Sequence, residues 1–130
     1  MHRGQQCYDD GAERYEVVRE VRGLGLMWAI EFAEPESRRR SWRLLERAQP
    51  GLFAQLVVVP LFSEHAILCQ VAGHRMNVVK ALPPLVVVDE DLELFARALD
   101  EVVRKAERMP RAMMGFALRA ARAGVGLRAR

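Results

Sequence analysis

Residues 18–32, VREVRGLGLMWAIEF, decide the fold of this 130-residue chain. Over the second half of the stretch, apolar residues alternate with glycine, methionine, alanine and glutamate, at Leu24, Leu26, Trp28, Ile30 and Phe32. Alternation with a period of two predicts a strand that buries one face. Gly23 and Gly25 allow a tight turn or a close backbone approach, because glycine lacks a Cβ atom. Residues 15–21 can form a short strand ahead of them.

A helix is expected after this strand, and a second one after a break. Ser37 is suited to be the N-cap of a helix over residues 37–48. Its apolar side includes Trp42, Leu44 and Leu45. Pro50-Gly51 breaks it. Residues 52–62 are ambiguous, because their valines favour a strand while their place between a breaker and another strand suits a short buried helix. We prefer the helix.

Two short strands and an extended segment are expected next. Residues 66–71 and 76–82 are apolar runs separated by an Ala-Gly-His turn. A Pro-Pro pair at 83–84 ends the second strand, since neither proline can donate to a sheet ladder. Residues 85–88 are expected to be extended.

The clearest amphipathic helix follows. Asp89 is expected to cap it, with Glu90 and Asp91 favourably placed at the positive end of the helix dipole. Apolar residues then recur at helical spacing, at Leu92, Phe95, Leu99, Val102, Val103 and Ala106. A stripe of this kind predicts one buried helix face. A weaker helix is expected over residues 110–123.

The order of elements predicts an α+β fold, a small and mainly antiparallel sheet with helices on one face. The strand alternation and the helix stripe both need an apolar partner, so they are expected to share a core. Its expected members are Leu26, Trp28, Ile30, Val78, Leu92, Phe95, Leu99 and Val102. Leu99→Ala is expected to cost ~2–5 kcal/mol if that side chain is fully buried.

Composition narrows the class of protein. The hydrophobic share of 51% and the charged share of 28% are typical of a globular domain. The longest apolar runs are far short of the ~20 residues that span a bilayer, and the first residues do not look like a signal peptide. Cys7 and Cys69 lie far apart, which suits two reduced thiols in a cytoplasmic protein.

The positive net charge belongs to one segment. Residues 109–130 hold five arginines and no acid, while the rest of the chain holds 15 basic and 17 acidic residues. A basic tail alone is a weak argument for nucleic acid as a partner.

Three segments in order resemble one family, the class III aminotransferases, which depend on pyridoxal phosphate. VREVRGLGLMWAIEF at 18–32 is similar to the strand that opens their C-terminal small domain. NVVKALPPLVV at 77–87 resembles the element that follows, and residues 89–106 resemble the terminal helix. The resemblance covers residues 14–108 and is specific through the order and spacing of the three motifs.

The resemblance implies the small domain of a fold-type I pyridoxal-phosphate transferase. Residues 16–108 would be that domain, residues 1–15 the remnant of a preceding helix or linker, and residues 109–130 a basic, weakly helical tail. The intact enzyme would be a homodimer acting on amines and keto acids. We expect the chain to expose an apolar contact surface for a missing large domain, at residues 52–62 or at Met113, Met114, Phe116 and Leu118.

The cofactor of this family is held by a lysine of the large domain. The chain has two lysines, Lys80 and Lys105, and neither lies in the family's cofactor-lysine context. We therefore expect no catalytic residue and no cofactor-binding residue here, and no activity from this chain alone.

Lys80 is the single site residue that the resemblance carries over. Relatives often have an arginine there that holds a substrate carboxylate, and lysine would bind it with less directionality. The alternative is that Lys80 merely pairs with a nearby acid. His65 and His74 lack a third ligand at metal spacing, so we expect no metal site, but a turn residue and a satisfied polar contact.

Two other functions remain open at this point. The chain can be a free-standing, non-catalytic α/β module for ligand sensing or dimerisation. It can also be a module that touches nucleic acid or anionic lipid through residues 109–130.

Overall fold

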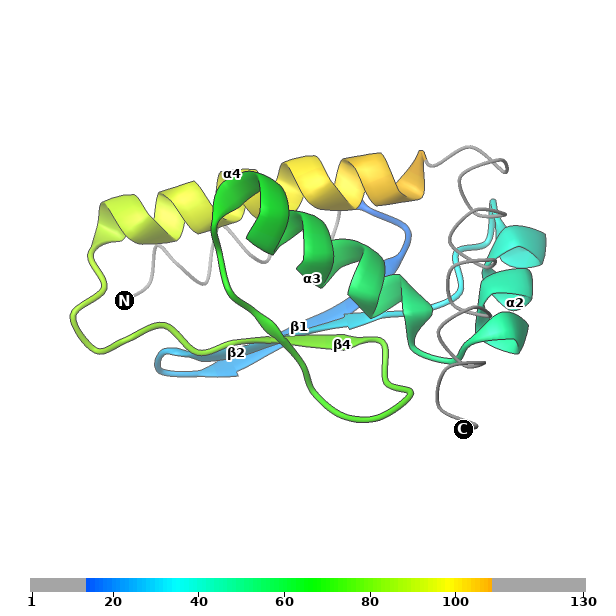
Figure 1. Ribbon diagram of the computed structural model, residues 1–130, viewed down its shortest axis with the longest axis horizontal. Coiled ribbons are helices and arrows are strands. Elements are labelled where there is room, and N and C mark those ends of the chain that lie inside the picture. The colour runs from blue at the N-terminus through cyan, green and yellow to red at the C-terminus, as the bar shows by residue number, and fades with distance from the viewer. Residues whose placement is uncertain (1–13, 109–130) are drawn as a thin grey trace, which may run out of the picture.

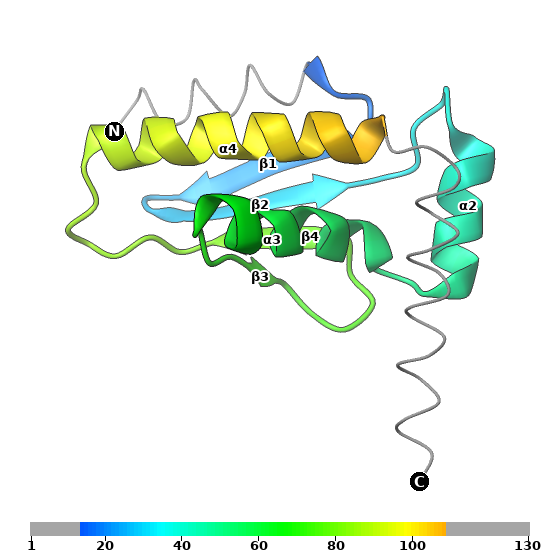
Figure 2. The ribbon, with the colours of Figure 1, turned by 45° about the horizontal axis from the view of Figure 1, so that its top comes forward.

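A computed structural model describes residues 14–108 (Figure 1). Its sheet contains β1 (Val18–Leu24), β2 (Met27–Phe32), β3 (Gln70–Val71) and β4 (Val78–Ala81). The strands are antiparallel in the order β1-β2-β4-β3. The helices are α2 (Arg39–Ala48), α3 (Leu52–His65) and α4 (Asp89–Glu107). Figure 2 shows α3 and α4 on one side of the sheet and α2 at its end, which confirms the predicted α+β arrangement.

The β1–β2 hairpin forms where the glycines allowed it. Gly25 has a φ of 61°, the left-handed region that suits glycine in a two-residue turn. A Cβ on Gly23 would lie 2.5 Å from the Trp28 ring, so this position needs a close approach. The expected burial of this strand face is wrong at one end, where Leu24 lies beside the turn and is 77% exposed.

The start of α2 differs from the expectation. The helix begins at Arg39 and no side chain caps it. Ser37 instead donates its hydroxyl to the Glu16 carboxylate, and its backbone N–H also points to Glu16 at 3.3 Å. Trp42 and Leu45 are buried as expected, but Leu44 is 55% exposed.

The ambiguous segment is a helix, as preferred. Gly51 precedes α3 with a φ of 79°, and a Cβ there would lie 2.8 Å from the backbone of Arg75. Five residues of the expected interface segment 52–62 are buried inside this domain: Leu52, Phe53, Ala54, Val57 and Leu61. The expectation that the segment as a whole is exposed was therefore wrong, although Val59 and Phe62 do face solvent.

The strands of the second half are shorter than expected. Ala66 ends α3 with a φ of 55°, and only Gln70–Val71 pairs with β4. Residues 85–88 are not extended throughout, because the Val87 N–H donates to the Pro84 carbonyl at 3.0 Å and closes a turn. Val88 rather than Asp89 is the N-cap of α4, and the Asp91 carboxylate accepts the Val88 N–H at 3.2 Å.

The core lies between the sheet and the two covering helices. Ile30, Phe95 and Val102 are buried in it, with Trp28 and Leu99 packed at its margin, as predicted. Val78 is buried as expected, at 6% exposed, but lies outside this cluster, to which its strand neighbour Val79 belongs. Leu26 and Leu92 lie outside this cluster. The buried thiol of Cys69 belongs to it, and burial raises its pKa.

The expectations for residues 110–123, for Cys7 and for the Met113 to Leu118 cluster lie outside the described residues.

Candidate functional site

Lys80 lies on the face of the sheet that α3 and α4 leave uncovered, which we call the open face. It is placed there by β4, where Val79 and Ala81 on either side point into the core. Its cross-strand neighbours are Ala29 in β2 and Gln70 in β3. Lys80 is half-buried, and no carboxylate among residues 14–108 pairs with it. Its ammonium is therefore available to an anion at this face.

An ionic network lies on the same face, beside Lys80. Arg22 Nη1 lies 2.8 Å from Glu31 and 2.9 Å from Glu20, and Arg19 lies 3.4 Å from Glu31. The hydrogen bond from Arg22 holds the pKa of Glu31 below its ordinary value. Glu31 is thus paired on the open face and directed at Arg22 rather than at Lys80.

The other side of Lys80 is apolar. Leu24 pairs with Met27, and Leu82 directly follows Ala81, the partner of Trp28. We call Leu24, Met27 and Leu82 the apolar row, and they are 77%, 55% and 56% exposed. The segment that follows β4 adds Leu85 and Val86, which are also strongly exposed. In Figure 1 the chain between β4 and α4 runs on the side of the sheet where the β1–β2 hairpin turns. Contiguous exposed apolar surface normally marks an interface.

Lys105, the second lysine, is fully occupied. Its ammonium lies 2.8 Å from Glu64 and 2.7 Å from Glu101. The hydrogen bond from Glu101, followed by that from Glu64, raises the pKa of Lys105. A protonated, ion-paired amine is a poor nucleophile.

Glu64, His65 and Glu101 are within metal-ligand reach of one another. Lys105 already bridges the two carboxylates, so the site of a cation is taken by its ammonium. The Nε2 atom of His65 is buried, has no hydrogen-bond partner among the described residues and lies 3.8 Å from Glu101. His74 is exposed in the turn before β4.

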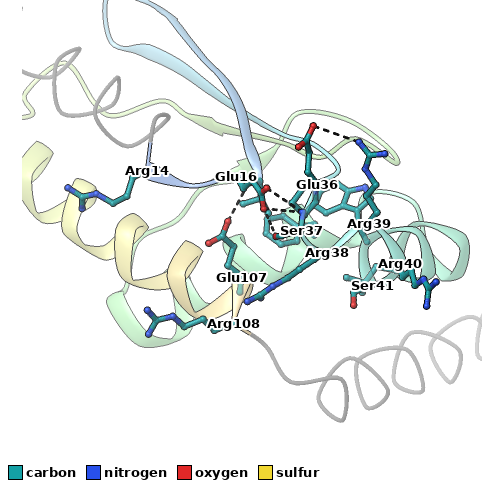
Figure 3. A pocket seen from close by; sticks show the side chains of 16 residues that line it. Arg14, Glu16, Glu36, Ser37, Arg38, Arg39, Arg40, Ser41, Glu107 and Arg108 are labelled. Carbon is teal, nitrogen blue, oxygen red and sulfur yellow. Dashed lines mark hydrogen bonds and ion pairs between the residues drawn. The ribbon is translucent and has the colours of Figure 1, made fainter.

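A cavity of about 790 Å³ opens at the opposite end of the domain, between the start of α2 and the end of α4 (Figure 3). Its described lining includes Glu16, Ser37, Arg38, Glu107 and Arg108, and no lysine. Covalent attachment of pyridoxal phosphate needs a lysine amine. The described lining of this cavity therefore offers no amine for that attachment.

Sequence reasoning missed the role of Asn77. Its side chain donates to Glu46 of α2 at 2.6 Å and accepts the Ala54 N–H of α3 at 3.2 Å. Its backbone carbonyl accepts the Phe32 N–H at 2.8 Å. One side chain next to β4 thus fixes two helices relative to the strand that carries Lys80. The signal available was the asparagine three residues before Lys80 in the NVVK motif.

Comparisons with known proteins bear on the family of the chain. The family described as aminotransferase class-III matches residues 5–103. A diaminobutyrate–2-oxoglutarate transaminase from Streptomyces avermitilis is 33% identical over 88 residues, which are 68% of this chain and 17% of that protein.

Solved structures show the same fold. An omega-transferase from Vibrio fluvialis superimposes with a TM-score of 0.62 at 18% identity, over 80% of this chain and 22% of its own. A transaminase from the marine bacterium Virgibacillus gives 0.60 at 21% identity, over 82% and 22%. The chain thus spans about a fifth of the length of these relatives. No described helix is both long and apolar enough to cross a membrane.

Proposed function

The chain belongs to the class III aminotransferases, and on that premise we propose that residues 16–108 form the C-terminal small domain of an enzyme that moves an amino group from an amine or amino acid to a keto acid. The observation that carries the proposal is the family match across residues 5–103 together with an unpaired lysine on the open face of the sheet.

In this proposal Lys80 binds the carboxylate of the substrate. Three features support the role: its position in the NVVK motif, its location on the open face and its lack of a carboxylate partner within residues 14–108. The ammonium of lysine is a point donor, so it would bind carboxylates that approach at different angles. It would not fix the orientation of the carboxylate.

The large domain would supply pyridoxal phosphate and the lysine that binds it. It would dock against the open face, where the row Leu24, Met27 and Leu82 is exposed. Docking there would enclose Lys80 between the two domains. The assembled enzyme would be a cytoplasmic homodimer, and residues 109–130 a basic tail.

Steady-state kinetics of the assembled enzyme test the role of Lys80. Lys80→Gln is expected to raise KM for a keto acid by about ten-fold or more, because a charged hydrogen bond contributes about 1.5–3 kcal/mol. An amine donor without a carboxylate should keep its KM. Lys80→Arg should restore keto-acid binding, and Lys105→Gln serves as a charge-matched control. Equal effects of Lys80→Gln on both substrates would disprove carboxylate binding.

Absorbance spectroscopy tests the proposal that the cofactor lysine lies in the large domain and not in this chain. The chain alone, mixed with pyridoxal phosphate, is expected to give no borohydride-reducible band of a lysine-bound cofactor. A reducible band that disappears on substituting Lys80 or Lys105 would contradict the proposal that the cofactor lysine lies in the large domain.

A further inference from the structure

The cavity beside α2 plays no part in the proposed amino transfer. Its floor is apolar and consists of buried residues of the core: Val17, Trp42, Leu45, Phe53 and Ala106. Its rim is polar and carries five arginines, three glutamates and two serines among the described residues. A volume of about 790 Å³ is within the range of small-molecule sites.

The carboxylates of the rim are already engaged. Glu16 accepts from the hydroxyl and the backbone N–H of Ser37. Glu107 accepts the Val17 N–H at 3.3 Å, and Glu36 lies 3.8 Å from Arg39. Of these contacts only that between Glu36 and Arg39 is an ion pair, and none involves the guanidinium groups of Arg38, Arg40 or Arg108.

Three rim arginines lack a counter-charge. Arg14 pairs with Asp100 at 3.0 Å, and Arg39 also lies 3.6 Å from Glu34. Within residues 14–108, no carboxylate pairs with Arg38, Arg40 or Arg108. The guanidinium donors of Arg38 and Arg108 are therefore available to an anion at the cavity mouth.

The arginines are not equivalent in direction. Figure 3 shows Arg38 extending from the start of α2 toward the end of α4, where Glu107 and Arg108 lie. Arg14 and Arg40 point outward in the same view. The first turn of α2 has no acidic residue and no capping side chain, so its positive end adds to the field of Arg38.

We propose that this cavity binds a small organic phosphate, with the phosphate group against Arg38 and Arg108 and an apolar body over Trp42 and Phe53. Guanidinium groups bind phosphate oxygens with matched, charge-assisted hydrogen bonds. The apolar floor distinguishes such a ligand from a bare ion, because it gains from burying an aromatic or aliphatic body. The site is independent of Lys80, which does not line it.

Isothermal titration of the full chain with phenyl phosphate tests the proposal. Phenyl phosphate is expected to bind about ten-fold or more tightly than inorganic phosphate, through the added apolar contact. Arg38→Gln and Arg108→Gln should each lower the affinity for phenyl phosphate about ten-fold, which is the effect expected from losing one charge-assisted hydrogen bond.

The matched control is Arg97→Gln. Arg97 is exposed on α4, has no carboxylate partner among residues 14–108 and does not line the cavity. The Arg97→Gln substitution removes the same charge and should leave the affinity for phenyl phosphate unchanged. Far-UV circular dichroism checks that each variant is folded.

Three results would overturn the proposal. They are no saturable binding at millimolar phenyl phosphate, equal affinity for inorganic phosphate, or an equal loss in Arg97→Gln. The second would mean that the floor contributes nothing, and the third that only the overall positive charge attracts the probe.

Discussion

The two faces of the sheet differ although the same strands build them. On one face Ile30, Phe32 and Val79 are 2%, 3% and 0% exposed beneath α3 and α4. On the other, Lys80, the Arg22–Glu31 network and the apolar row Leu24, Met27 and Leu82 remain accessible. Because side chains alternate along a strand, adjacent residues can stabilise the domain and serve a partner. The covered face accounts for folding, and the open face for the proposed assembly.

The largest effect is expected from truncating the covered face. Ile30→Ala should lower the free energy of unfolding by ~2–5 kcal/mol, since it deletes buried methylenes and leaves a cavity. Lys80→Ala, on the open face, should change it by less than about 0.5 kcal/mol. Urea unfolding of both variants measures the difference. Similar losses would mean that the open face is also part of the core.

The contacts that hold the helices over the covered face should matter next. Asn77→Ala should cost about 1–3 kcal/mol, because it leaves the buried Ala54 N–H without its acceptor and Glu46 without its donor. Gln70→Ala, an exposed residue of β3, is the control and should be close to neutral. Urea midpoints separate the two. No loss in Asn77→Ala would show that water replaces its hydrogen bonds.

Charging the apolar row should alter association rather than stability. Met27→Glu combined with Leu82→Lys is expected to leave the free energy of unfolding within about 0.5 kcal/mol, as for surface positions generally. The same variant should reduce self-association in light scattering, because it removes the exposed apolar surface. A parent chain that is already a monodisperse monomer would contradict a docking role for this row.

The smallest effect concerns pH. Arg22 lowers the pKa of Glu31, so their pairing stabilises the folded chain above the ordinary glutamate pKa. This contribution is lost as the pH falls through about 4 and below. Glu31→Gln should therefore lower the free energy of unfolding slightly at neutral pH, leave it nearly unchanged at low pH, and so flatten the acid limb of a stability–pH curve. An unaltered acid limb would show that the pairing does not contribute in solution.

Much of the covered face could be predicted because its signals are local. The alternation through Ile30 and Phe32, the stripe through Phe95 and Val102, and the break at Gly51 all lie within short windows. The helix over residues 52–62 could be predicted from its place between a helix break and a strand, whereas its valines favoured a strand.

The open face and its supports depend on longer-range contacts. The alternation placed Leu24 on the expected buried face, but Leu24 lies beside the hairpin turn and is exposed to solvent. Asn77 acts on Glu46 and Ala54, which lie 31 and 23 residues away in sequence. β3 has only two residues, and Ala66 before it lies in the left-handed region, which nothing in the identity of alanine predicts. Lys80 was singled out through a family motif, and its face follows from strand parity.

The reactivity of Cys69 can report how often the covered face opens. Its thiol is 6% exposed, and burial raises its pKa, so both access and thiolate formation are suppressed in the closed state. Alkylation of this cysteine in a Cys7→Ser background would therefore proceed only through openings of the layer between α3 and the sheet. The labelling rate, divided by that of the unfolded chain, gives the population of those openings under native conditions. A thiol with no assigned chemistry thus reports how often the domain exposes its interior before a partner joins it.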